Sequence, residues 1–155
     1  MAKIDKGRVV LGGLVAGVVL NAGEFLLNEV ILGAQWEEAL RALNLPEPCT
    51  CVIVVMVALM FLVGIYTVWL YAAIRPRYGA GPRTAVCAGL AVWLIYYLLG
   101  FGSSALLGIF PVKLVLIAVA WGVVEMILAA LAGAWLYKEE EPAAAASAPA
   151  GQAQS

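Results

Sequence analysis

The chain has 155 residues, of which 65% are hydrophobic and only 12% charged, and its mean hydropathy of +0.99 excludes a water-soluble globular domain. Its net charge of −1 leaves no basic surplus for nucleic-acid phosphates, and the absence of histidine excludes histidine-based triads, zinc sites and haem ligation. We therefore expect an integral membrane protein whose partner is the lipid bilayer, with no nucleic acid, no cofactor and no metal site.

Four segments are long and apolar enough to cross a membrane, since about 20 helical residues span the roughly 30 Å hydrocarbon core. They run over residues 9–32, 51–74, 84–106 and 112–137. The third segment is expected to end or distort near Gly102, ahead of Pro111. The pattern predicts an all-α fold, a four-helix transmembrane bundle that occupies residues 1–141.

The regions outside these spans are short. Within the loop of residues 33–48, four apolar residues recur at helical spacing and predict a short interfacial helix: Trp36, Ala39, Leu40 and Leu43. Residues 142–155 contain seven Ala, two Pro and no aromatic residue, which predicts a disordered tail.

Basic residues gather at one end of the spans, which is typical of the cytoplasmic side. They are Lys3, Lys6, Arg8, Arg75, Arg77, Arg83 and Lys138. We therefore expect a multi-pass protein of the inner (cytoplasmic) membrane with both termini in the cytoplasm. A cleaved signal peptide is disfavoured because bulky Leu20 stands where a small residue is needed.

The second and fourth spans end alike, with Trp-Leu-Tyr at 69–71 and again at 135–137, each followed five residues later by proline. The first and third spans open alike, with an arginine followed by a small-Gly-Leu step. These similarities indicate two repeated helical hairpins in parallel orientation. The general enrichment of aromatic and basic residues at membrane interfaces is the alternative explanation.

Small and polar residues share one face on the first and fourth spans. These two faces comprise Gly13, Gly17, Asn21, Glu24 and Asn28 on the first span, and Ala118, Gly122, Glu125, Ala129 and Gly133 on the fourth. Small residues let helices approach closely, and carboxylates in a membrane turn toward protein or water. We therefore expect the two faces to pack on each other, with Gly13, Gly17, Gly122 and Ala129 as helix-packing residues.

Counting residues from the basic ends gives the depth of the polar groups. Asn21 and Glu125 each lie 13 residues from Arg8 and Lys138, or about 20 Å, and Glu24 lies 16 residues away, or about 24 Å. Asn21 is therefore expected opposite Glu125, with Glu24 close by. Because no lysine or arginine lies at this depth, we expect at least one glutamate to be protonated.

Three interpretations of Asn21, Glu24 and Glu125 stay open at this point. They form a site that binds a proton, a cation or a cationic substrate, or a neutral hydrogen-bonded clasp between helices, or separate carboxylates that snorkel toward water. Asn28 and Glu29 lie near the outer surface, where solvation accounts for both.

Two further groups of side chains carry weaker signals. Cys49 and Cys51 lie at the outer mouth of the second span, where a local disulfide or unreactive thiols are favoured over a thiol oxidoreductase. Four aromatic residues could stack on a ligand, although packing is the simpler interpretation. These are Trp93, Tyr96, Tyr97 and Trp121.

The runs RVVLGGLVAG at 8–17 and WLYAAIRPRYG at 69–79 resemble those of small four-span bacterial integral membrane proteins with no assigned activity. The resemblance implies four spans over most of the chain outside the tail, and it implies no mechanism.

Two functions fit these features. The first is a small transporter, channel or proton-coupled permease that uses the intramembrane carboxylate pair Glu24 and Glu125. We expect it to form a homo-oligomer or part of a larger complex, because four helices enclose little space. The alternative is a structural or accessory subunit of a larger membrane complex. An enzyme is not predicted.

Overall fold

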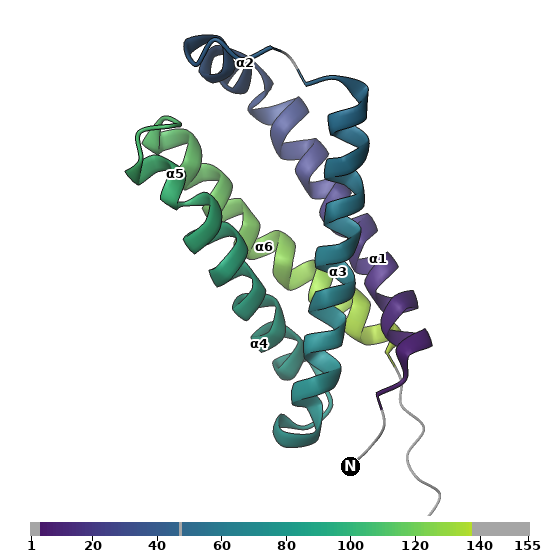
Figure 1. Cartoon of the computed structure of the whole chain (residues 1–155). Coiled ribbons are helices and arrows are strands. Elements are labelled where there is room, and N and C mark those ends of the chain that lie inside the picture. Colours follow the sequence, from purple (N-terminus) through teal and green to yellow (C-terminus); the bar gives the residue numbers. More distant parts are fainter. Residues whose placement is uncertain (1–3, 47, 138–155) are drawn as a thin grey trace, which may run out of the picture.

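The computed structural model describes residues 4–46 and 48–137, so the predicted tail at 142–155 lies outside the described residues. All regular secondary structure in these ranges is helical (Figure 1). The elements are α1 (Lys6–Phe25), η1 (Leu26–Ile31), α2 (Gly33–Ala42), α3 (Thr50–Tyr78), α4 (Pro82–Trp93), η2 (Leu94–Phe101), α5 (Ser103–Leu106) and α6 (Val112–Leu136). The segments η1 and η2 are π-helices.

Four stretches of these helices have the length and apolar composition needed to cross a membrane. They are Lys6–Ile31, Thr50–Tyr78, Pro82–Leu106 and Val112–Leu136. The fold is thus all-α and compatible with a multi-pass membrane protein. The expected short helix in the first loop is present as α2, whose Ala39 is buried while Glu37 and Glu38 are exposed.

The second membrane-length helix is longer than the sequence suggested. We expected Arg75 and Arg77 in a loop, but α3 continues past them to Tyr78 and includes Pro76. Proline has no backbone N–H, so the helix lacks the one hydrogen bond that residue 76 would donate to the carbonyl oxygen of Ala72. The helix ends at Gly79, whose φ of 85° lies in the left-handed region that favours glycine.

Both π-helices continue an α-helix without a break in direction. Helix α1 becomes η1 at Leu26, which the sequence pattern did not suggest, and α4 becomes η2 at Leu94, well before the expected distortion at Gly102. A π-helix turns its side chains out of the 3.6-residue register and is common at functional sites. Each of these two segments contributes one side chain to the polar cluster, Asn28 from η1 and Tyr97 from η2.

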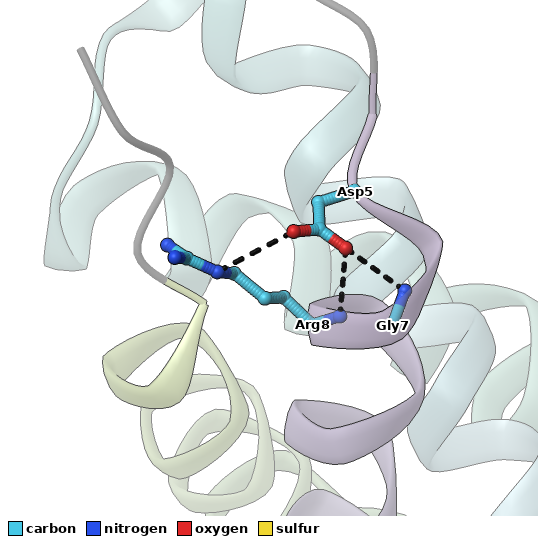
Figure 2. A network of polar contacts seen from close by, with 3 residues as sticks. All are labelled: Asp5, Gly7 and Arg8. Carbon is cyan, nitrogen blue, oxygen red and sulfur yellow. Dashed lines mark hydrogen bonds and ion pairs between the residues drawn. The ribbon is translucent and has the colours of Figure 1, made fainter.

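The first helix begins at a side-chain cap (Figure 2). The carboxylate of Asp5 accepts hydrogen bonds from the backbone N–H groups of Gly7, at 2.9 Å, and Arg8, at 3.1 Å. Its second oxygen lies 3.4 Å from Nε of Arg8. Because the first N–H groups of a helix lack intrahelical partners, this cap fixes where α1 starts.

Glycine allows α1 to contact two helices at once. A Cβ atom on Gly12 would come within 2.6 Å of the carbonyl oxygen of Gly133 in α6, and one on Gly64 of α3 would come within 2.5 Å of the Gly13 carbonyl oxygen. Such close backbone approaches are typical of small-residue packing between membrane helices. The start of α1 and the end of α6 lie at the same end of the molecule (Figure 1).

The second half of the chain packs in the same way. Helices α4 and α6 run side by side (Figure 1), and a Cβ atom on Gly89 would lie 2.8 Å from the carbonyl oxygen of Met126. At the opposite end from the N-terminus, α2 packs through the ring of Trp36 on Phe101 of η2 and on Phe110 of the α5–α6 connection. Trp36 is 5.3 Å from Phe110 and 6.0 Å from Phe101, measured between ring centroids. We call Trp36, Phe101 and Phe110 the aromatic cluster.

Candidate functional site

Three helical segments bring polar side chains to one point. The hydroxyl oxygen of Tyr97, in η2, lies 2.5 Å from Oε1 of Glu24, in α1, and 3.0 Å from Oε2 of Glu125, in α6. We call Glu24, Tyr97, Glu125 and the neighbouring Asn28 the carboxyl cluster. The two predicted glutamates are therefore brought together, with a tyrosine hydroxyl between them.

Asn28 completes the cluster from η1. Its side-chain Nδ2 donates a hydrogen bond to Oε2 of Glu24 over 2.5 Å. The expectation that solvation at the outer surface accounts for Asn28 is therefore wrong, because its amide donates a hydrogen bond to Glu24. Glu29, the next residue, is exposed as expected.

Burial differs between the two glutamates. Glu125 and Tyr97 are each only 4% exposed, whereas Glu24 is half-buried. Oε1 of Glu125 is buried and has no hydrogen-bond partner among the described residues. A buried charged oxygen without a partner is costly, and a neutral carbonyl oxygen in the same place costs much less.

Two glycines make room for the cluster. A Cβ atom on Gly23 would come within 2.5 Å of Oε1 of Glu125, so the carboxyl group rests against the backbone of α1. A Cβ atom on Gly122 would come within 2.6 Å of the Tyr97 ring, which rests against α6 in the same way. The cluster is closely packed on both sides.

Asn21 is not part of the cluster, and its predicted position opposite Glu125 is wrong. Its Nδ2 donates to the carbonyl oxygen of Gly17 over 2.8 Å and lies 3.4 Å from that of Val57 in α3. The amide thus faces α3. Gly13 and Gly17 also face α3, where added Cβ atoms would meet Ile65 and Phe61.

The expected packing of the first span on the fourth is present, but part of the small-residue face of the first span turns toward α3 instead. Gly12 and Ala16 precede Gly13 and Gly17 by one residue each, or about 100° around the helix, so they turn toward α6 while Gly13, Gly17 and Asn21 turn toward α3. The residues of α1 that contact α6 closely are Gly12, Ala16 and Gly23. Gly122 and Ala129 are buried in α6, Gly122 against Tyr97.

No lysine or arginine hydrogen-bonds to either glutamate in the part of the chain that the structure describes. In these ranges, the acidic partners of Arg8 and Arg41 are Asp5 and Glu37, far from the cluster in the sequence. The donors that reach the two carboxyl groups are the Tyr97 hydroxyl and the Asn28 amide. Neither donor carries a positive charge.

Counting hydrogens limits the protonation state of this arrangement. A tyrosine hydroxyl has one proton, so Tyr97 can donate to only one of its two carboxyl neighbours. The other contact is a hydrogen bond only if that carboxyl group carries a proton and donates it to the Tyr97 oxygen. The geometry therefore suits one negative charge and one carboxyl proton shared over two glutamates.

Tyr97 was missed as a site residue, although a usable signal was present. It follows Arg83 by 14 residues, or about 21 Å of helix, which matches the depth of Glu125 from the same membrane side. A depth count limited to charged and amide side chains leaves Tyr97 out. Extending it to tyrosine hydroxyls would have placed Tyr97 beside the glutamates.

Among the other candidate groups, Trp93 and the two cysteines have structural partners. Trp93 Nε1 donates a hydrogen bond to the carbonyl oxygen of Val119 over 2.9 Å, which joins α4 to α6. Cys49 and Cys51 form a disulfide, one of the two states expected for them. Within residues 4–46 and 48–137, no group of three or more Cys, Asp or Glu side chains could hold a metal ion.

Comparison of the chain with protein-family models, with curated proteins and with solved structures gave no match. The functional proposal below is therefore based on the geometry of the carboxyl cluster.

Proposed function

We propose that the chain is a small membrane transporter, channel or proton-coupled permease whose carboxyl cluster binds and releases a proton. One observation carries the proposal: a tyrosine hydroxyl joins two carboxyl groups from the first and last membrane-length helices, and no cationic side chain of the described residues reaches them. Ionisable groups inside membrane helices are costly and mark ion and proton pathways.

The packing around the cluster favours a proton over a larger ligand. The Glu125 carboxyl group lies against the backbone at Gly23, and the Tyr97 ring lies against Gly122, at distances that a single methyl group would disturb. A bulky cationic substrate needs space between these groups, whereas a proton needs only hydrogen-bonded oxygens. The oxygens are already at hydrogen-bonding distances of 2.5 and 3.0 Å.

We place both termini in the cytoplasm of a cell with the chain in the inner membrane. The start of α1 and the end of α6 lie at the same end of the molecule (Figure 1), and Arg75, Arg77 and Arg83 belong to that end through the α3–α4 connection. Basic residues are retained on the cytoplasmic side. The aromatic cluster around Trp36 then faces the outside.

The repeated-hairpin hypothesis stays a prediction with one supporting feature. In each half of the chain, the first membrane-length helix changes from α to π geometry partway along, at Leu26 and at Leu94. The second helix of each half, α3 or α6, is α-helical throughout. A duplicated hairpin accounts for this shared change of geometry.

Proton flux in proteoliposomes tests the proposal. With a pH-sensitive dye inside the vesicles, the wild-type protein is expected to dissipate an imposed pH gradient, and the Glu24→Gln/Glu125→Gln double variant is expected not to. Glu29→Gln is the matched control, because Glu29 is exposed and lies in η1 next to Asn28. Equal flux in the wild-type and double-variant proteins rules out the carboxyl cluster as the site.

A structural or accessory subunit is the second candidate, and one observation favours it. Every residue of α3 from 50 to 59 is exposed, although the segment is strongly apolar. Lipid covers such a surface in a monomer, and a helix of a second copy or of another membrane protein covers it in a complex. A photo-crosslinking residue at Val55 distinguishes these cases by the mass of its products in native membranes.

The two candidates also differ in what the cluster must do. As a clasp, it needs only hydrogen bonds, so Glu125→Gln is tolerated while Glu125→Leu destabilises the fold. As a proton site, it needs an ionisable group, so Glu125→Gln leaves a folded protein without proton flux. Thermal unfolding in detergent and flux in proteoliposomes, measured on both variants, separate the two functions.

A further inference from the structure

We propose that Tyr97 is a proton relay that passes a proton between Glu125 and Glu24. The inference rests on the proposed function and specifies the path that the proton takes between the two glutamates. It is carried by the position of the Tyr97 hydroxyl, which is the only described group within hydrogen-bonding distance of both carboxyl groups. The buried Oε1 of Glu125 has no partner among the described residues, which indicates that Glu125 is the carboxyl group that holds the proton.

The resting arrangement follows from donors and acceptors. Glu24 accepts from Tyr97 and from Asn28, so two donors stabilise a negative charge on it. Glu125 is deeply buried and has one unpartnered oxygen, which disfavours a charge there. The proton therefore rests on Oε2 of Glu125 and is donated to the Tyr97 oxygen, while the Tyr97 hydroxyl donates to Oε1 of Glu24.

The relay step moves two protons and changes no other bond. Glu125 gives its proton to the Tyr97 oxygen as Tyr97 gives its own hydroxyl proton to Oε1 of Glu24. An O–H bond breaks at Glu125 and at Tyr97, and an O–H bond forms at Tyr97 and at Glu24. Tyrosine is neutral before and after the step, and the negative charge has moved from Glu24 to Glu125.

The surroundings give the relay a buried end and an open end. The relay groups are Glu24 from α1, Tyr97 from η2 and Glu125 from α6, and Asn28 from η1 donates a hydrogen bond to Glu24. None of these carries a positive charge. Glu24 is half-buried while Glu125 is 4% exposed, so a proton that reaches Glu24 is closer to solvent or headgroups.

Tyr97→Phe tests the relay, with Tyr96→Phe as the matched control. Tyr96 lies beside Tyr97, with ring centroids 5.0 Å apart, and is 39% exposed. Removing the Tyr97 hydroxyl is expected to lower proton flux in proteoliposomes by about a hundredfold, in the range of general acid–base contributions, while Tyr96→Phe keeps flux within about twofold. In wild-type protein, flux is also expected to slow in D₂O.

The outcomes separate the relay from the function on which it rests. If the Tyr97→Phe variant keeps wild-type proton flux, the relay is overturned while the proton site is not. Absence of flux in the wild-type protein overturns both. If Tyr97→Phe does not fold, Gly122→Ala displaces the ring and keeps the hydroxyl, since its Cβ would lie 2.6 Å from that ring. Unchanged flux in a folded Gly122→Ala variant then contradicts the relay.

Discussion

The Glu125 carboxyl group lies directly against the backbone of Gly23, so that a Cβ atom at position 23 would stand 2.5 Å from its Oε1. This contact joins the last membrane-length helix to the first at the depth of the carboxyl cluster. A residue larger than glycine at position 23 occupies the space of the carboxyl oxygen. Gly23 therefore sets where the Glu125 side chain can lie.

We predict that Gly23→Ala folds normally and loses proton flux. The atoms that the new methyl group meets are at the flexible end of the Glu125 side chain, which can move aside at little cost. Alanine also favours the helix over glycine by about 0.5–1 kcal/mol, which offsets that cost. The displaced carboxyl group no longer reaches Tyr97, so flux in proteoliposomes falls while the melting temperature in detergent stays close to that of the wild type.

Gly33→Ala is the control for this substitution, because the nearest heavy atom to its added Cβ is an ordinary 3.6 Å away. The control is expected to keep full flux. A folded Gly23→Ala variant with wild-type flux contradicts the claim that Glu125 must lie against α1 to work.

The membrane-length helices and the two intramembrane glutamates could be predicted from the sequence, because composition and spacing identify both. Long apolar runs identify membrane-length helices, and Glu24 and Glu125 stand out as charges within them. The meeting of these two glutamates could be anticipated by counting residues along each helix. The small residues that bring helices together were also visible as a stripe.

The helix that each residue of the small-residue face contacts could not be predicted in the same way. Gly12 and Gly13 lie about 100° apart around α1, and the rotation of the helix about its axis decides that Gly12 faces α6 and Gly13 faces α3. The two π-helices also shift the register of Asn28 and Tyr97, and the residue pattern does not predict this change from α- to π-helix. Rotation about the helix axis is set by packing, which one sequence does not display.

Helices α1 and α3 meet where Gly64 faces Gly13 and Gly17, and we predict that Gly64→Ala destabilises the fold by about 1–3 kcal/mol. An added Cβ would lie 2.5 Å from the Gly13 carbonyl oxygen and 2.6 Å from the Gly17 nitrogen. These are backbone atoms, so a whole helix must shift to relieve the overlap. Unfolding in detergent measures the loss, with Gly33→Ala as the reference; equal stability of the two variants contradicts close α1–α3 packing.

The Cys49–Cys51 disulfide encloses a single residue, and we predict that its removal has a small effect on stability. The chain-entropy model gives about 1.6 kcal/mol for so short a loop, well below the values for long loops. The Cys49→Ser/Cys51→Ser variant is therefore expected to stay folded with a slightly lower melting temperature. Loss of folded protein in this variant, or on adding reductant to the wild type, contradicts the prediction.

The ring of Trp36 packs on Phe110 and Phe101 and holds α2 over the end of α6, so we predict that Trp36→Ala releases α2 without unfolding the membrane-length helices. Truncating a fully buried tryptophan costs about 3–5 kcal/mol, and we expect about 2 kcal/mol here because Trp36 is half-buried. Hydrogen exchange measures the result: amides of Gly33–Ala42 should exchange faster in the variant, while amides of Val112–Leu136 keep their protection. Exposed Trp135 supplies the control variant Trp135→Ala, which should leave exchange in α2 unchanged. Unaltered exchange of α2 in Trp36→Ala shows that contacts other than the aromatic cluster hold this helix in place.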